Sequence, residues 1–428
     1  LRLIRDFYSP FCYFLGSVLK KVLAIGYVWP EPNSSAAGSH MMSLLRLFKR
    51  QGWSIEFATP AQETEHMIDL SEEGITSQSI QLNCDSFDQY IEELQPDVVM
   101  FDRFMMEEQF GWRVEKVCPN AFKLLDTEDL QFLRNARHEA VKKETELTKA
   151  HLYSDLAKRE IAAILRCDLS LIISSYEMEL LQSQFNIDPK LLHHLPFMVD
   201  LNTLAESTKS FEERKHFMTI GNFRHAPNWD AVLQLQKIWP KIRKQLPDTE
   251  LHIYGSYPPP KATALHNPKT GFHIKGWAKD AQEVMEQARV CVAPLRFGAG
   301  IKGKLLDAMK LQTPNVTSEI GSEGMLPQGE LQWPGAVADD IDEFVEQAVA
   351  LYKDEEKWLK AQSQCHSILE AHYEQNQLGD KLIERLTALE SDLESHRLDN
   401  FFGSMLKHHS MASTKYMSQW IAEKNKIK

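Results

Sequence analysis

The stretch RFGAGIKGKLLDAMK at residues 296–310 links an apolar segment to an amphipathic one. The preceding RVCVAPL (289–295) is typical of a buried strand, and the residues after Gly303 repeat with the period of a helix. A glycine-rich turn between a strand and a helix presents free backbone N–H groups at the positive end of the helix dipole. The stretch therefore predicts a phosphate-binding loop in an α/β domain.

Charged residues in and after this loop indicate which phosphate it would bind. Lys302 and Lys304 supply two positive charges, which match a diphosphate better than a single phosphate. Asp307 lies about one helical turn, or roughly 5.4 Å, beyond Lys304 on the same face, where a carboxylate can accept from ribose hydroxyls. We predict a nucleoside diphosphate site; the alternative is a tight turn with a solvated helix start. The predicted contacts are Gly298, Ala299, Gly300, Lys302, Lys304 and Asp307.

The glycine spacing in this loop is also G-x-G-x-x-G, the fingerprint of a dinucleotide site. In that fingerprint the first glycine follows the strand almost directly, in the first connection of the sheet. Here Arg296 and Phe297 intervene, and the loop is the fourth strand-to-helix connection of its domain. An NAD-dependent oxidoreductase is therefore the less favoured interpretation, although it stays open.

Short apolar segments alternate with longer amphipathic ones along the chain, and the alternation restarts after a polar stretch near residues 198–214. This pattern predicts an α/β protein with two doubly wound parallel-sheet domains, facing each other across a cleft at the carboxyl ends of their strands. We assign residues 19–200 to the N-terminal domain, 201–390 to the C-terminal domain and 391–428 to a helical tail that could pack back on the first domain; 1–18 are expected to lie outside the fold.

Two other loops of the second domain are candidates for the same ligand. In TIGNFRHAPNWDAV (219–232) a strand leads directly into Gly221, Asn222 and Arg224, which could face phosphate, and Asn228 is a plausible helix N-cap. A later strand ends in Gly276 and Trp277, which could offer backbone groups and a ring face to a nucleotide base. The alternatives are a capped helix start and a core tryptophan.

In the first domain, polar residues follow the ends of predicted strands. Asp102, Arg103 and Asp126 would point to the rim of the cleft, where carboxylates can bind an acceptor or act in acid/base catalysis. Such carboxylates are also common helix caps. The small residues Ala37 and Gly38 open a helix and could let a substrate approach the backbone. We take Asp126, Asp102 and Lys304 as catalytic candidates, and Ala37, Gly38 and Arg103 as the acceptor side.

Composition narrows the function classes. The chain has 428 residues and a formal net charge of -12, which argues against nucleic acid as a partner. Basic segments near both ends of the chain could contact an anionic membrane surface. The six cysteines form no C-x-x-C, and the single D-x-D at 340–342 is better explained as a helix cap than as a metal site. We expect a cytoplasmic protein without a metal site, and these basic segments could place it at the inner face of the membrane.

Two long stretches, VCVAPLRFGAGIKGKLLDAMKLQTPNVTSEIGSEGM (290–325) and IGNFRHAPNWDAVLQLQKIWPKIRKQLPDTELHIYG (220–255), resemble the donor domain of retaining GT-B glycosyltransferases of the group one family, in a subgroup with a Gly-Ala-Gly donor loop. The resemblance implies that the N-terminal domain binds an acceptor and the C-terminal domain a nucleotide diphosphate sugar. Asp307 matches the second acidic residue of the family's Glu-x7-Glu motif, and the first falls at Ala299.

The resemblance further implies transfer of a sugar to an acceptor hydroxyl with retention of configuration, without an obligatory metal or other cofactor. The acceptor would be a carbohydrate or lipid-linked, in the synthesis of a surface polysaccharide or glycoconjugate. A nucleotide-sugar epimerase of the same fold, an NAD-dependent oxidoreductase and a non-catalytic binding protein remain as alternatives.

Overall fold

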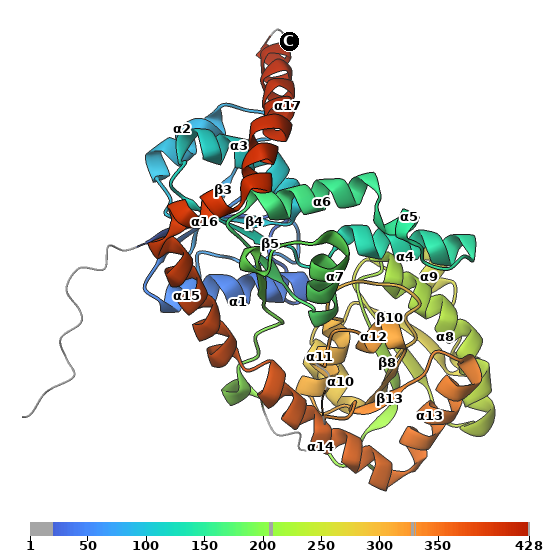
Figure 1. Ribbon diagram of the computed structural model, residues 1–428. Coiled ribbons are helices and arrows are strands. Elements are labelled where there is room, and N and C mark those ends of the chain that lie inside the picture. Colours follow the sequence, from blue (N-terminus) through green and yellow to red (C-terminus); the bar gives the residue numbers. More distant parts are fainter. Residues whose placement is uncertain (1–19, 205–208, 327–328, 330, 427–428) are drawn as a thin grey trace, which may run out of the picture.

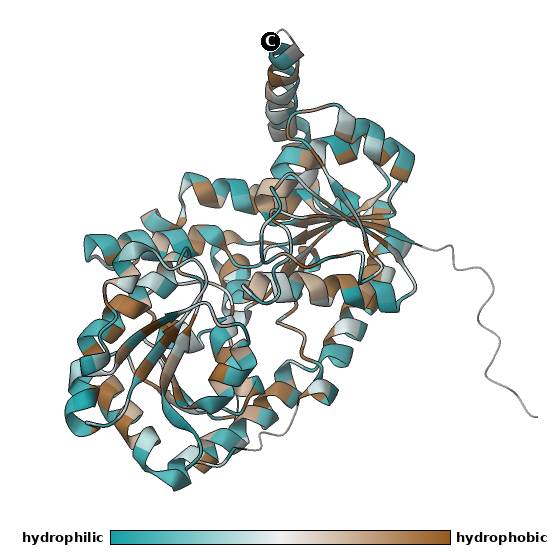
Figure 2. Cartoon of the chain, turned by 180° about the vertical axis from the view of Figure 1, so that it is seen from behind, coloured by the Kyte–Doolittle hydropathy of each residue, from teal (hydrophilic) through white to brown (hydrophobic). Residues whose placement is uncertain are grey.

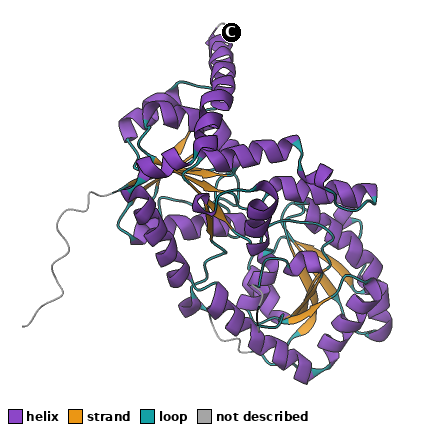
Figure 3. Cartoon of the chain, in the orientation of Figure 1, coloured by secondary structure: helices purple, strands orange, loops and turns teal. Residues whose placement is uncertain are grey.

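The computed structural model describes residues 20–204, 209–326, 329 and 331–426. Residues 1–18, expected outside the fold, are not among them. The described chain forms two α/β units that lie against each other, with one long C-terminal helix projecting from the first (Figure 1). In each unit a central sheet lies between layers of helices (Figure 3). This is the predicted architecture of two doubly wound parallel-sheet domains.

The first sheet has seven strands in the described chain, in the order β3-β2-β1-β4-β5-β6-β7, and every pair is parallel. Its inner strands are buried on both faces, so they appear in the sequence as continuous apolar runs rather than alternating ones. The strands are β1 (Lys21–Ile25), β2 (Ser54–Thr59), β3 (Thr76–Ser79), β4 (Val98–Asp102), β5 (Phe122–Asp126), β6 (Leu169–Ile172) and β7 (Leu192–His194).

Helices cover both faces of this sheet. Between β5 and β6, the chain forms two longer helices with a single helical turn between them. The helices are α1 (Ala36–Arg50), α2 (Ser86–Leu94), α3 (Phe104–Val117), α4 (Gln131–Lys143), α5 (Lys149–Leu152), α6 (Asp155–Arg166) and α7 (Ser175–Phe185).

The second sheet has six described strands in the order β10-β9-β8-β11-β12-β13, again all parallel. They are β8 (Lys215–Ile220), β9 (Leu251–Tyr254), β10 (Phe272–Gly276), β11 (Ala288–Ala293), β12 (Asn315–Thr317) and β13 (Gly335–Val337). Their helices are α8 (Ala226–Gln245), α9 (Pro260–Thr263), α10 (Ala281–Gln287), α11 (Gly303–Lys310), α12 (Glu319–Ser322), α13 (Ile341–Lys353) and α14 (Glu355–His372).

Two local features of this domain have clear explanations. A proline inside a helix usually kinks or breaks it, but α8 continues through Pro240, because Ile238, Trp239 and Ile242 around the proline are buried in the core. Asp340, the first residue of the D-x-D motif, accepts hydrogen bonds from the N–H groups at the start of α13 and so acts as the expected cap.

The chain crosses between the domains twice, and the two crossings lie side by side. The Val199 N–H donates to the Tyr373 carbonyl at 2.7 Å, and the Gln375 N–H donates to the Val199 carbonyl at 2.9 Å. After the second crossing, α15 (Gln375–Ser391) buries Leu382 and Leu386 in a core cluster of the first domain. The boundary expected at residue 390 therefore falls inside a layer that packs on the first domain.

The last two helices, α16 (Leu393–Asp399) and α17 (Phe401–Lys426), continue along the first domain, where α17 contacts α3 and α6. Arg397 anchors them. Its guanidinium binds both carboxylate oxygens of buried Asp168, at 2.8 and 2.7 Å, and the carbonyls of Pro119 and Ala121. This pairing holds the pKa of Asp168 below its usual value despite burial, which acts in the opposite direction.

We expect Arg397→Ala to lower the free energy of unfolding by about 3 kcal/mol, because it leaves the Asp168 carboxylate buried without its main partner. Urea denaturation measures the change. Lys190→Ala is the matched control, since Lys190 of the first domain forms an exposed ion pair with Asp399 at the end of α16. Exposed pairs contribute about 0–1 kcal/mol. Equal effects of the two substitutions would contradict the proposed anchoring.

Apolar residues concentrate along the strands of both sheets, and the outer faces of the helices are mostly hydrophilic (Figure 2). Among the described helices, none combines the length and the apolar run that crossing a bilayer requires.

Candidate active site

The predicted phosphate loop, here called the donor loop (residues 296–302), lies at the contact between the two domains. Arg137 of α4 donates to the Gly298 carbonyl at 2.9 Å. The same guanidinium binds both carboxylate oxygens of Glu323, which follows α12, at 2.7 Å each. One arginine of the first domain therefore fixes two loops of the second.

Gly300 is the tightest point of the donor loop. Its φ is +60°, and a Cβ there would lie 2.8 Å from the Asp129 Cβ of the first domain, so both backbone conformation and space require glycine. Its N–H donates to Glu177 at 2.8 Å, a carboxylate that also accepts from the Leu130 N–H. Burial raises the pKa of Glu177 to about 7. This amide, expected to face phosphate, is thus held by a first-domain side chain.

The two lysines of the predicted site have different partners. The Lys302 ammonium donates to the Gly300 carbonyl at 2.7 Å, inside its own loop. The Lys304 ammonium donates to the Asn228 side-chain oxygen at 2.8 Å. Burial lowers the pKa of each lysine to about 8. Both positive charges are therefore poorly solvated, which strengthens their attraction to an incoming anion.

Asn228 joins the donor loop to the first loop of the domain. Its amide donates to the Asn222 carbonyl at 3.0 Å, and a Cβ on Gly221 would lie 2.6 Å from its side-chain nitrogen. The expectation that Asn228 caps a helix is wrong, because α8 begins two residues earlier at Ala226. Its side chain is left free to bridge the two loops that the sequence identified separately.

Arg224 and Trp277 lie along the same side of the domain interface. The Arg224 guanidinium stacks on the Tyr257 ring at 3.6 Å. Trp277 is not a core residue: 44% of it is exposed, and its ring stacks on His66 of the first domain at 4.9 Å between centroids. Gly276 before it has a φ of +75° and open space at its Cβ position. The exposed Trp277 ring and the Gly276 backbone therefore lie beside a contact between the two domains.

Asp307 and the helix start of the first domain complete the predicted set. Asp307 is exposed and pairs with Lys310 of the same helix at 3.0 Å. A Cβ on Gly303 would lie 2.4 Å from the Ala36 Cβ, so the start of α11 touches the start of α1. Ala37 lies in the first turn of α1. A Cβ on Gly38 would meet the Glu31 backbone at 2.5 Å, so this glycine serves close packing of its own loop.

Asp102 and Asp126 end neighbouring strands and lie opposite each other in the β4–β5 register. Both are buried, and neither caps a helix: Asp102 accepts from the Tyr27 N–H at 2.9 Å, and Asp126 accepts from the Glu128 N–H at 3.3 Å. Arg103 lies 3.7 Å from Asp102. The predicted carboxylates therefore form one buried cluster at the carboxyl end of the sheet.

His40 and Glu128 belong to this cluster although the sequence analysis did not select them. Burial opposes the charge of His40, but Asp126 at 3.5 Å outweighs it and raises the pKa of His40 to about 9. Burial raises the pKa of Glu128 to about 8. Glu128 and Arg103 have φ of +61° and +68°, a strained conformation for non-glycine residues that is enriched at functional sites.

A family model matches the second domain of the chain only. Residues 214–354 match the family model described as "Glycosyl transferases group 1". By this match, the second domain is similar to group 1 glycosyltransferase domains, and it is here called the group 1 domain. The matched range begins just before β8, ends just after α13 and includes the donor loop and Lys304. A search of curated proteins found no match to the chain.

Solved structures share the fold over most of the chain, across both domains. Sucrose-phosphate synthase from Thermosynechococcus elongatus has a TM-score of 0.65 at 13% identity, over 87% of this chain and 100% of that one. Anabaena HepE in complex with UDP-glucose has a TM-score of 0.65 at 12% identity, and the match covers 86% of this chain and 100% of HepE. A TarM variant from S. aureus in complex with UDP has a TM-score of 0.55 at 14% identity, and the match covers 70% of this chain. The chain spans only 57% of the length of that TarM structure. The group 1 domain and its first-domain partner together have the GT-B fold.

The pKa values of the two lysines give a pH prediction. If their charges offset the diphosphate, kcat/KM should fall as the pH rises through about 8, because the free protein then loses ammonium protons. Initial rates at subsaturating donor between about pH 7 and pH 9 measure this fall in kcat/KM. Lys304→Arg should make this fall less steep, since the guanidinium stays charged while Lys302 still loses its proton near pH 8. A profile that is flat over this range would contradict the role given to these charges.

Proposed function

We propose that the protein is a glycosyltransferase that moves a sugar from a nucleoside diphosphate sugar to an acceptor hydroxyl with retention of configuration. One observation carries the proposal. Within the group 1 domain, Lys304 and Asn228 join the donor loop to the loop at Gly221 and Asn222, which unites the two predicted phosphate-facing segments. The binding elements for a diphosphate are thus assembled at one place, at the contact with a second domain.

In the proposed reaction the second domain binds the donor. Lys302, Lys304 and Arg224 offset the negative charge that builds on the leaving nucleoside diphosphate, which is often the largest contribution to catalysis. Asp307 accepts from the ribose hydroxyls, and Trp277 offers its exposed ring to the base. No metal or other obligatory cofactor takes part in this proposal, because side-chain cations supply the positive charge.

The first domain binds the acceptor. Asp126 and Asp102 lie at the ends of central strands, and Asp126 is held beside His40. We propose that this cluster orients the acceptor hydroxyl, with Arg103 and the α1 start at Ala37 and Gly38 on the acceptor side. The acceptor is a carbohydrate or lipid-linked, which would place the protein in surface polysaccharide or glycoconjugate synthesis.

The printed names of the neighbours suggest the order in which donors are tested. HepE is named in complex with UDP-glucose, and the TarM variant with UDP. Release of nucleoside diphosphate from UDP-glucose, UDP-galactose, UDP-N-acetylglucosamine and GDP-mannose should be measured with a library of sugar and polyprenyl-linked acceptors. The anomeric proton of the product gives the stereochemistry by NMR.

The same assay separates the alternatives. Transfer with an unchanged anomeric configuration supports the proposal, and inversion would contradict retention. An epimerase would convert the donor sugar without an acceptor. An oxidoreductase would change the absorbance of NAD and release no nucleoside diphosphate.

We also propose a peripheral contact of α17 with the inner face of the cytoplasmic membrane. Large apolar side chains are exposed along it, including Phe402 at 65%, Tyr416 at 66% and Trp420 at 59%, beside Lys415 and Lys424. Aromatic and basic residues together favour an anionic lipid surface. Sedimentation with phosphatidylglycerol vesicles tests this, with loss of binding expected for Tyr416→Ser/Trp420→Ser. Equal sedimentation of this variant would contradict it. The first 19 residues of the basic N-terminal segment lie outside the described residues.

A further inference from the structure

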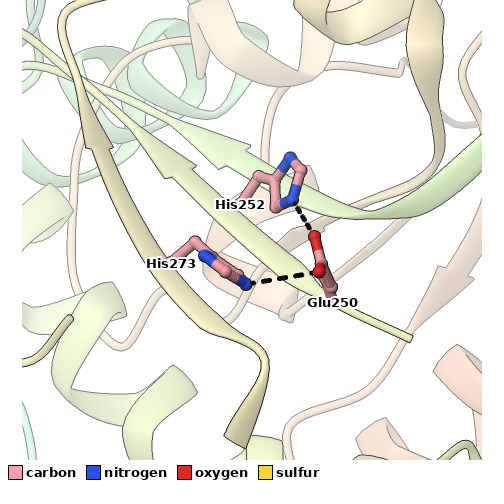
Figure 4. Close-up of side chains that lie close together, drawn as sticks. All are labelled: Glu250, His252 and His273. Carbon is pink, nitrogen blue, oxygen red and sulfur yellow. Dashed lines mark hydrogen bonds and ion pairs between the residues drawn. The ribbon is translucent and has the colours of Figure 1, made fainter. Parts of the chain in front are cut away.

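A cluster of imidazole and carboxylate groups lies on the second sheet, away from the donor loop. Glu250 directly precedes β9, His252 lies in β9 and His273 in β10 (Figure 4). The His252 Nε2 is 2.7 Å from one Glu250 oxygen, and the His273 Nε2 is 3.5 Å from the other. One ligand atom from each of the three residues lies within 4.8 Å of the other two.

The backbone itself brings these residues together. His252 and His273 are directly paired in the parallel β9–β10 register. Glu250 precedes His252 by two residues, and residues two apart along a strand share a face of the sheet. The convergence therefore follows from the strand register and does not depend on one choice of side-chain rotamer.

The cluster has nitrogen atoms that no hydrogen bond accounts for. Within the described chain, His273 Nε2, which faces Glu250, is buried without a hydrogen-bond partner. His252 Nδ1 and His216 Nε2 are also unpartnered, but the His252 atom beside Glu250 is its Nε2, and His216 lies outside the three-residue set. The His216 ring stacks on His252 with centroids 3.9 Å apart. The large majority of buried polar side-chain atoms in proteins have a partner, so the unpartnered His273 Nε2 calls for a ligand that the protein atoms do not provide.

We propose that Glu250, His252 and His273 bind a divalent transition-metal ion, with Zn²⁺ as the first candidate. Two imidazole nitrogens and one carboxylate oxygen are a recurrent ligand set for zinc, with bonds of about 2.0–2.2 Å. Tetrahedral ligands at that bond length lie roughly 3.4 Å from one another. The observed 2.7 and 3.5 Å separations bracket this value. Mg²⁺ and Ca²⁺ prefer all-oxygen ligands and do not fit.

The position of the site assigns it a structural role. It lies at the amino-terminal end of β9 and near that of β10, whereas the donor loop follows the carboxyl end of β11. A bound ion would tie the edge strand β10 to β9 and leave the proposed transfer chemistry untouched. Glu250 is about half exposed, with 48% of its side chain accessible, which gives the ion a path of entry.

The full chain, stripped of metal with a chelator and dialysed, tests the proposal by isothermal titration and thermal unfolding with ZnCl₂, CoCl₂ and MgCl₂. We expect one Zn²⁺ per chain, a raised Tm, a tetrahedral Co²⁺ absorption spectrum and no response to Mg²⁺. His273→Gln should weaken Zn²⁺ binding by more than roughly 100-fold, because even groups that only support a metal ligand are worth 10–100-fold.

Two further variants keep the outcome decisive. Glu250→Gln removes a ligand charge at a half-exposed position, so it remains informative if His273→Gln fails to fold. His366→Gln is the matched control, since it removes an exposed histidine on α14 outside the cluster. Loss of binding in the cluster variants but not in His366→Gln supports the site. No Zn²⁺ binding to the wild type, or binding that survives Glu250→Gln unchanged, would overturn it.

Discussion

Lys304→Ala is expected to lower kcat/KM for glycosyl transfer by about 10²–10³, the usual cost of removing one group that stabilises charge in a transition state. The Lys304 ammonium is held by Asn228 where the first and fourth loops of the group 1 domain meet. In the proposed mechanism, removing it takes away a poorly solvated charge that offsets the leaving diphosphate. Steady-state rates of nucleoside diphosphate release measure the effect.

Lys241→Ala is the control for this experiment. Lys241 lies on α8 and forms an exposed ion pair with Asp342, so its loss changes the overall charge equally without touching the loops. Its kcat/KM should stay within about twofold of wild type, as for surface changes generally. A Lys304→Ala protein that is folded and as active as Lys241→Ala would remove Lys304 from the mechanism.

Arg137→Ala has the second largest expected effect. Its guanidinium ties the first domain to the Gly298 carbonyl and to Glu323, so its loss loosens the donor loop and leaves Glu177 on the Gly300 N–H as its remaining first-domain anchor described above. We expect kcat to fall by about 10²-fold, since misplacement of about 1 Å can cost that much. Binding of the nucleoside diphosphate alone should change far less, because Lys304 and Asn228 stay in place.

The contrast between kcat and binding distinguishes positioning from simple destabilisation. Arg159→Ala is the control, because Arg159 makes an exposed bidentate pair with Glu108 away from the loop. Arg137→Lys should recover part of the rate, because it restores the positive charge but not the paired hydrogen bonds of the guanidinium to Glu323. Proportional losses of kcat and of nucleotide affinity in Arg137→Ala would contradict the positioning role.

The fold could be predicted because its signals are local. Buried parallel strands appear as apolar runs, helices as amphipathic ones, and the glycine-rich donor loop lies between the two. Asp102 and Asp126 were placed at strand ends for the same reason. A local signal also misled, because Asn228 was expected to cap a helix and instead bridges two loops.

The interdomain partners could not be predicted, because they depend on contacts distant in the sequence. Arg137 meets Glu323 across 186 positions, and Glu177 meets Gly300 across 123. Nothing near Arg137 or Glu177 distinguishes either from a solvated helix residue. His40 likewise acquires its raised pKa only from strand-end acids of another part of the chain. Glu128 could have been selected from the sequence, because it lies between the two aspartates of the DTED segment at residues 126–129.

Nucleotide binding tests the central claim most directly. The Tm of the full chain should be measured with UDP, GDP, ADP, dTDP and NAD, on the wild type and on Asp307→Ala. We predict that at least one nucleoside diphosphate raises the wild-type Tm, that Asp307→Ala weakens this rise and that NAD has no effect. Stabilisation by NAD alone, or no response to any nucleoside diphosphate, would contradict the account.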